Sequence, residues 1–481
     1  MLPVILVASL MASFDYMVVN VAAPSLQRDL HAGSAALELV VAGYGFTYAA
    51  AMVTGGRLGD LFGHRRLFLL GMSGFTLASL GCGLAGTAGE LVGARMVQGL
   101  TAAAMVPQVL ALISRVFPAG ERARAISWFG VALGVGGTAG QVLGGLLLQA
   151  DLWGLGWRVI FLVNLPIGLV TVVLAGRWLP VTRADRQPRL DPLGSLGLSA
   201  ALALVLVPLA LGRQAGWAPW IWLLLAAAVP VGAATLRWER RLAARGAEPL
   251  LDPALFAARS FSAGLVVTVA FMAGFGSFMF VLTLLAQGGL GLDALRTGLA
   301  FLPLGLLTMA SSLAGRRLVA RYGLRVLVAG NLLTITGMLL LAAELHLRGA
   351  AMTQSWLLAP LGLVGLGCGL TVPALVGSVL SGVRPDQAGA ASGVLSTAQQ
   401  FAGAAGVAVL GSVFFAVLGG HPGRAEFVRA AQWALLLDLL LVVGATALIA
   451  LLRPRPAAPA PAGVTAAQSV LRPAPLLDRR M

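Results

Sequence analysis

The sequence predicts an all-α polytopic membrane protein, and three observations support this fold class. Of its 481 residues, 58% are hydrophobic and only 11% are charged, whereas a soluble domain carries about 25% charged residues. The charges gather in short clusters between apolar runs of roughly 20 residues, the length of a helix that crosses the bilayer core. These runs are continuous and do not alternate as barrel strands would. Because lipid cannot satisfy backbone polar groups, the runs are expected to be helices.

Fourteen transmembrane helices are expected in chain order. The first run begins at Leu2 with no basic residues before it, so it is predicted to be a retained helix and not a cleaved signal. The tail after Leu452 is rich in Pro and Ala and is predicted to be disordered. The predicted spans are 3–24, 36–56, 67–86, 89–112, 124–148, 158–176, 192–212, 218–236, 261–287, 297–315, 324–345, 355–381, 388–418 and 431–452.

An internal repeat divides these spans into two halves. The segment GRLGDLFGHRR after the second span matches RRLVARYGLR after the tenth, with Arg57 over Arg317 and Gly63 over Gly323. Such parallel halves are a transporter architecture with the substrate path between them. The predicted parts are a six-helix bundle at 1–176, two extra central helices at 177–259, a second six-helix bundle at 260–452 and a disordered tail at 453–481.

The basic residues indicate the orientation. All 33 are Arg. The loops after even-numbered spans, together with the tail, hold 25 of them, the opposite loops hold seven, and Arg95 lies inside a span. Basic residues collect on the cytoplasmic side, so both termini are expected there. This loop distribution also argues against a nucleic-acid-binding surface, despite a net charge of +15.

The sequence does not favour an enzyme. Its four His residues fall in predicted loops without metal-ligand spacing, and we find no nucleophile elbow, no phosphate-binding loop and no zinc motif. Cys82 and Cys368 lie within apolar runs and are expected to be small core residues. No metal and no cofactor other than coupling protons is expected.

Two charged residues within spans are the strongest functional candidates. Asp15 lies in the middle of the first span, where an acid costs on the order of 2.5–3.5 kcal/mol to insert. Desolvation favours its protonated form and a nearby cation its charged form, so a balanced site can exchange protons. Arg95 stays protonated and needs a partner, and Gln98 shares its helix face. We predict that Arg95 tunes proton exchange at Asp15; the alternative is a structural ion pair.

The segment after the second span is predicted to be a cytoplasmic gating loop. It holds the glycines and charges of a tight, basic turn: Gly56, Arg57, Asp60, Gly63, Arg65 and Arg66. A charge latch between the halves is expected, with Asp60 near the N-terminus of the thirteenth span, where an anion is stabilised. The alternative is that these arginines only enforce topology.

The fifth span combines small residues with one amide. Glycines at intervals of four predict a groove for close helix packing, and the residues of this packing motif are Gly136, Gly140, Gly144 and Gly145. Polar residues within spans are candidates for the substrate cavity, namely Asn20, Tyr44, Gln98, Gln108, Gln141, Asn164, Gln399 and Gln400. Asp438 in LLLDLLL has no role that the pattern explains.

Several of these segments resemble the major facilitator superfamily. GRLGDLFGHRR (56–66) is close to that superfamily's loop signature, and FDYMVVNVAAP (14–24) resembles the first-helix motif of its 14-helix drug:proton antiporter branch. LVGARMVQGLTAAA (91–104) resembles the fourth-helix motif, whose Arg is implicated in proton coupling, and WRVIFLVNLPIG (157–168) resembles the sixth-helix entry. In the helix-5 motif, Gln141 replaces a proline that the family links to helix bending and to sealing against proton leak.

The resemblance implies a proton-coupled exporter of small hydrophobic or amphipathic compounds that works by alternating access. The expected setting is a bacterial plasma membrane, with a small-molecule substrate, no nucleic-acid partner and a monomeric state. Two alternatives stay open, a carrier for one specific metabolite and a non-transporting membrane sensor with the same fold.

Overall fold

The computed structural model describes residues 1–451 except 181–190, 213–214, 247–248, 250–252, 324, 382, 384–387 and 421–422. Within this part, fourteen helical segments are long and apolar enough to cross a membrane, which confirms the predicted helix number. The helices of the first half are α1 (Leu2–Asp29), α2 (Ser34–Phe62), α3 (His64–Leu84), α4 (Ala88–Val116), α5 (Ala119–Ala150), α6 (Val159–Leu162) and α7 (Asn164–Trp178), the last two forming one span.

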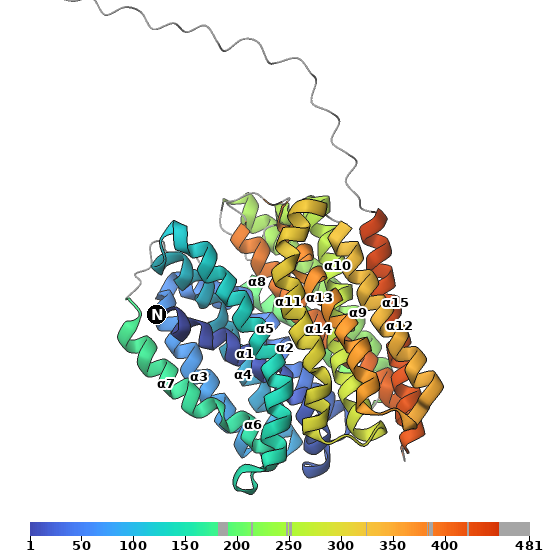
Figure 1. Cartoon of the computed structure of the whole chain (residues 1–481). Coiled ribbons are helices and arrows are strands. Elements are labelled where there is room, and N and C mark those ends of the chain that lie inside the picture. The colour runs from blue at the N-terminus through green and yellow to red at the C-terminus, as the bar shows by residue number, and fades with distance from the viewer. Residues whose placement is uncertain are drawn as a thin grey trace, which may run out of the picture.

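The second half contains six further helices, and two helices link the halves in sequence. The linking helices are α8 (Pro192–Leu211) and α9 (Pro219–Ala244). The second half consists of α10 (Arg259–Leu284), α11 (Ala294–Tyr322), α12 (Arg325–Arg348), α13 (Gln354–Ser381), α14 (Ala388–Leu418) and α15 (Arg424–Leu451). Figure 1 shows the blue-to-green first half beside the yellow-to-red second half.

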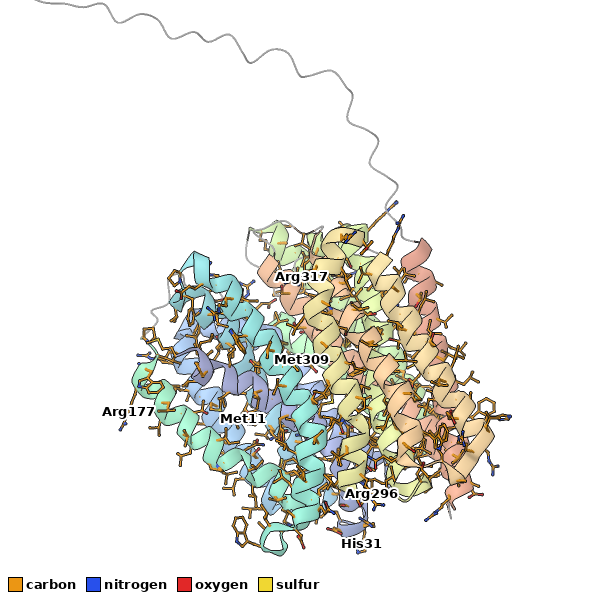
Figure 2. All side chains as sticks on the ribbon, in the orientation of Figure 1. Met11, His31, Arg177, Arg296, Met309 and Arg317 are labelled. Carbon is orange, nitrogen blue, oxygen red and sulfur yellow. The ribbon has the colours of Figure 1, made fainter. Side chains whose placement is uncertain are left out.

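The helices alternate in direction, so the bundle has two ends. Arg317 lies at one end, and His31 and Arg296 lie at the other (Figure 2). We call the first the arginine-rich end; it also carries the turn at Gly63 and the end of α15. We call the second the opposite end.

The turn between α2 and α3 corrects the predicted gating loop. α2 continues to Phe62 and α3 begins at His64, so the connection is Gly63 alone, with φ 89°. This φ favours glycine, since a Cβ is strained there. The loop was predicted because hydropathy ends where the bilayer ends, whereas a helix whose polar residues face water can continue past that boundary.

Glycines let α5 approach α1 closely. A Cβ added at Gly136 would lie 2.5 Å from the Leu10 carbonyl oxygen, and one at Gly140 would lie 2.6 Å from the Phe14 carbonyl oxygen. A Cβ added at Gly144 would lie 2.6 Å from the Val18 side chain. Small residues permit such backbone contact in membrane helices. Three of the four motif glycines therefore hold α5 against the helix that carries Asp15.

The tightest contacts between the halves lie toward the opposite end. There the fourth motif glycine, Gly145, faces α11, where a Cβ would lie 2.4 Å from the Ala294 carbonyl oxygen. Gln287 donates to the Val21 carbonyl at 2.8 Å, joining the start of the second half to α1. Gly130 and Gly134, nearer the arginine-rich end of α5, would gain no neighbour within 4 Å on receiving a Cβ. The two halves are thus closed together at the opposite end.

The linking helices are central in sequence but lie at the side of the bundle. α8 packs against α9, α2 and α14, whereas α9 contacts α8 and the short 3-10 helix Pro253–Ala257. Ser195 and Ser199 of α8 hydrogen-bond to Thr54 and to the Ala50 carbonyl of α2. The Ser412 hydroxyl of α14 reaches the Leu209 carbonyl of α8 at 3.5 Å. α8 therefore spans the seam between α2 and α14.

Candidate functional site

A buried polar network lies inside the first half, with Asp15 at its centre. Asp15 is fully buried in the middle of α1. Its Oδ1 accepts hydrogen bonds from Gln98 Nε2 at 3.0 Å and from Asn164 Nδ2 at 2.9 Å. Its Oδ2 accepts one from Arg95 Nη1, in an ion pair whose two side chains are both completely buried. Three helices, α1, α4 and α7, thus meet at this carboxylate.

Arg95 is held by several partners besides Asp15. Its Nη1 donates to Gln98 Oε1 at 2.7 Å and its Nε donates to the Val40 carbonyl at 3.2 Å. The guanidinium lies 4.5 Å from the ring centroid of Tyr44, a distance at which the ring quadrupole stabilises a cation. Nη2 has no hydrogen-bond partner among the described residues. One donor of this cation is therefore available to another acceptor.

The partners of Asp15 oppose the effect of its burial. Burial penalises a lone charge severely, but a paired cation and several hydrogen bonds offset the penalty. Adding a proton would cancel the Coulomb attraction to Arg95 and change which groups donate to Asp15. Because both side chains are inaccessible here, water reaches them only after a conformational change.

Sequence reasoning missed Ser79 of α3. Its hydroxyl accepts hydrogen bonds from Gln98 Nε2 at 2.6 Å and from Asn164 Nδ2 at 2.9 Å, so it links the two amides that contact Asp15. Serine is common in membrane helices and often bonds to its own backbone. The sequence does show Ser79 as a polar residue within an apolar run. That is a weak indication of function, because a hydroxyl is easily accommodated in a membrane helix.

Gln108 does not join this network. It is fully buried near the arginine-rich end of α4, where Nε2 donates to the Gly55 carbonyl at 2.9 Å. Its Oε1 lies 2.7 Å from His64 Nδ1, and an amide oxygen only accepts, so Nδ1 donates. This bond anchors the first turn of α3 to α2 and α4.

The residues of the predicted gate have separate surroundings. Arg57 Nη2 donates to the Pro249 carbonyl, beyond α9, at 2.9 Å. Arg65 donates to the Gly176 carbonyl of α7, within the first half. Asp60 lies 3.5 Å from His64 Nε2. Gly56 is half-buried and Arg66 is exposed. Asp60 was predicted to lie near the N-terminus of the thirteenth span, which is α14. The residues immediately before α14, 384–387, lie outside the described residues.

The other cavity candidates differ in burial and in their hydrogen bonds. Gln141 and Asn20 are buried, and each has an amide oxygen without a partner in the described part of the chain. Gln141 Nε2 lies 3.9 Å from Met17 Sδ, at the crossing of α5 with α1. Gln399 and Gln400 are half-buried on α14. The Tyr44 hydroxyl donates to the Ala12 carbonyl at 3.3 Å, which fixes its ring beside Arg95.

Comparison with known proteins places the chain in a family of transporters. The Major Facilitator Superfamily profile matches residues 5–407. The chain is 37% identical over 422 residues to a probable actinorhodin transporter from Streptomyces coelicolor, covering 87% of this chain and 73% of that protein. It is 38% identical over 417 residues to a puromycin resistance protein from Streptomyces alboniger, covering 86% and 81%. It is also 36% identical over 412 residues to a multidrug resistance protein from Mycobacterium tuberculosis, covering 85% and 74%.

Solved structures of transporters have the same fold. A bacterial homologue of the lysosomal transporter Spinster, in an inward-facing conformation, matches with a TM-score of 0.66 at 15% identity, covering 94% of this chain and 95% of that one. The xylose transporter of E. coli, in a partially occluded inward-open conformation, matches with a TM-score of 0.62 at 14% identity, covering 94% and 97%. The fold, the profile match and the relatives together show that this chain is a multi-pass membrane protein of the major facilitator superfamily.

Proposed function

We propose that the chain exports small hydrophobic or amphipathic compounds, including antibiotics, in exchange for protons. The observation that carries the proposal is the buried ion pair of Asp15 and Arg95, supported by Gln98, Asn164 and Ser79. Charged groups within membrane helices are costly and mark ion pathways. The relatives named for actinorhodin, puromycin and multidrug resistance support the substrate class.

The chemistry follows from the two protonation states of Asp15. In an outward-open state, water at the more acidic side protonates the carboxylate and weakens its attraction to Arg95. In an inward-open state, the neutral acid loses its proton to the cytoplasm and the ion pair re-forms. A substrate that binds in the inward-open state and leaves in the outward-open state is thereby moved outward in exchange for protons that move inward.

We infer that the arginine-rich end faces the cytoplasm of a bacterial cell, with both termini inside and the chain acting as a monomer. The excess of basic residues in these loops supports this orientation. With that orientation, closure at the opposite end corresponds to an inward-facing state. A reporter phosphatase fused after residue 481 should be inactive, and one inserted at Asp293 active; the reverse pattern would overturn the orientation.

The coupling role of Asp15 is tested in inverted membrane vesicles energised by respiration. A pH-sensitive dye in the lumen reports proton release when lipophilic cations or antibiotics are added singly. Wild type should respond, and Asp15→Asn should lose the response because the amide cannot take up a proton. Asp29→Asn, at the exposed end of the same helix, is the matched control and should respond normally.

The outcomes separate the alternatives. An equal response in Asp15→Asn would move the coupling site elsewhere. A response only to a single antibiotic would favour a specific metabolite exporter, a possibility that relatives named for one antibiotic support. Silence toward every compound would contradict drug export.

A further inference from the structure

A second acid is buried in the membrane, in the half that lacks the Asp15 network. Asp438 lies in the middle of α15 and is 1% exposed. Its Oδ1 has no other hydrogen-bond partner among the described residues, and the buried polar side chain beside it is Ser277 of α10, whose hydroxyl interacts with the carboxyl. A Cβ at Gly274, one turn away, would lie 3.7 Å from Oδ1. The carboxyl therefore faces α10 in the interior of the second half.

No cation accompanies Asp438 within the described part of this half. Asp438 lies on α15, and α10, α12 and α14 pack on that helix. Apart from Asp438, the charged residues of α10, α12 and α15 lie near the helix ends: Arg259 on α10, Arg325, Glu344, His346 and Arg348 on α12, and Arg424, Glu426 and Arg429 on α15. Arg348 pairs with Glu344 at 2.5 Å and Arg429 with Glu426 at 3.6 Å. The sequence of α14 contains no ionisable residue. Since a buried carboxylate without a cation is heavily penalised, the neutral, protonated acid is favoured in this state.

The carboxyl lies at the inner end of a small cavity that extends toward the opposite end of the bundle. Besides Asp438, its lining is apolar and comes from the outer turns of α10, α12 and α15, including Phe278, Leu285, Leu341, Leu345, Ala431 and Leu435. Its volume is about 10 Å³, close to the order of 10–15 Å³ that one water molecule requires. The cavity thus leaves room for about one water molecule beside the acid, on the side that faces the opposite end.

We propose that Asp438 is a second proton-binding site, in the second half, that is loaded from the opposite end. This inference rests on the proposed proton coupling and extends it from one site to two. Binding takes one proton from water at the opposite end and converts the carboxylate to the neutral acid; release of that proton to water at the arginine-rich end, in another state of the cycle, returns the carboxylate. The first half pairs its acid with Arg95, while the second half holds its acid with no cation beside it among the described residues.

A contact between the halves connects this site to the closure. α10 ends in a π-helical turn, Leu285–Gly289, a distortion that is frequent at functional sites. Leu285 lines the cavity, and Gln287 of the same turn donates to the Val21 carbonyl of α1. On its other side the turn packs on α15, where a Cβ at Gly288 would lie 2.4 Å from Phe427. Water that enters the cavity to hydrate a charged Asp438 would displace Leu285, and with it the turn whose Gln287 bonds to α1 in the other half.

Infrared difference spectroscopy of the purified full chain tests proton binding directly, with protons as the only probe. Wild type at neutral pH should show the C=O stretch of a protonated carboxylic acid, and Asp438→Asn should lack it. The band should disappear from wild type as the pH is raised. Asp293→Asn is the matched control, because the exposed Asp293 caps α11 through an oxygen that asparagine retains. A band unchanged in Asp438→Asn, or one that does not titrate, would overturn the proposal.

Transport then shows whether the site takes part in coupling. In the vesicle assay with a lipophilic cation such as tetraphenylphosphonium, Asp438→Asn should still transport but should move one proton fewer per substrate molecule than wild type. If the number of protons moved per substrate molecule is the same in Asp438→Asn as in wild type, Asp438 does not take part in coupling, even if its infrared band titrates. Failure of wild type to exchange protons would contradict the proposed function, while the infrared result would stand.

Discussion

Replacing Arg95 with leucine should abolish coupled transport and lower the free energy of unfolding by about 3–5 kcal/mol. The substitution leaves the fully buried Asp15 carboxylate without its cation, and it removes the donors to Gln98 Oε1 and to the Val40 carbonyl. The variant is measured by denaturant unfolding in detergent and by the vesicle assay. Survival of coupled transport at the wild-type rate would show that Arg95 is not part of the coupling machinery.

Two further variants separate stability from function. Arg348→Gln removes a partly exposed ion pair with Glu344 and should change stability by about 1 kcal/mol or less. The double variant Asp15→Asn with Arg95→Leu removes both buried charges and should recover part of the lost stability. It should not recover proton coupling, because no carboxyl group remains in the network. Recovery of coupling in the double variant would contradict the role assigned to Asp15.

Replacing Gly298 with valine should shift the protein away from the state that is closed at the opposite end. A Cβ at Gly298 would lie 2.5 Å from the Gln141 carbonyl oxygen and 3.2 Å from Val142 Cα, at the crossing of α11 with α5. Overpacking of this kind costs about 1–3 kcal/mol, and applied to one state it shifts the equilibrium by roughly 5- to 150-fold. Substrate efflux should slow, since the cycle must pass through the disfavoured state.

The shift is measured with a cysteine at Ser412, which is 6% exposed and contacts Glu38 across the closed seam. A membrane-impermeant maleimide should label this cysteine faster in Gly298→Val than in the parent protein. The background should be low, because the native Cys82 and Cys368 are buried. Gly444→Val is the matched control, since a Cβ there meets nothing within 4 Å. Equal labelling in Gly298→Val and the control would mean that this crossing does not set the state.

The spans and the family could be read from the sequence because they depend on local chemistry. A run of about 20 apolar residues has to be helical in lipid, whichever partners it meets. The boundaries were less certain, as the extension of α2 to Phe62 shows. Hydropathy reports where lipid ends, and the hydrogen bonds of a helix do not stop there.

The sequence also identified most of the buried network, residue by residue. Asp15, Arg95, Gln98 and Asn164 each stand out as polar groups in apolar helices, where insertion is costly. Ser79 does not stand out, because a hydroxyl is tolerated in any membrane helix. Gln108 looks as conspicuous as Gln98, yet it bonds to Gly55 and His64 near the arginine-rich end.

The sequence by itself determined the number of membrane helices, their repeat and the presence of two acids that a bilayer does not readily accept. Only the tertiary structure decided which polar groups meet. Asp15 and Asn164 are 149 residues apart and come together because glycines and short turns bring α1, α4 and α7 around one point. The same packing gave Asp15 a cation, whereas Asp438 lies beside a small cavity with no cation next to it in the part of the chain that the structure describes. Protonation depends on what surrounds a carboxyl in space, and that arrangement arises only when the helices pack.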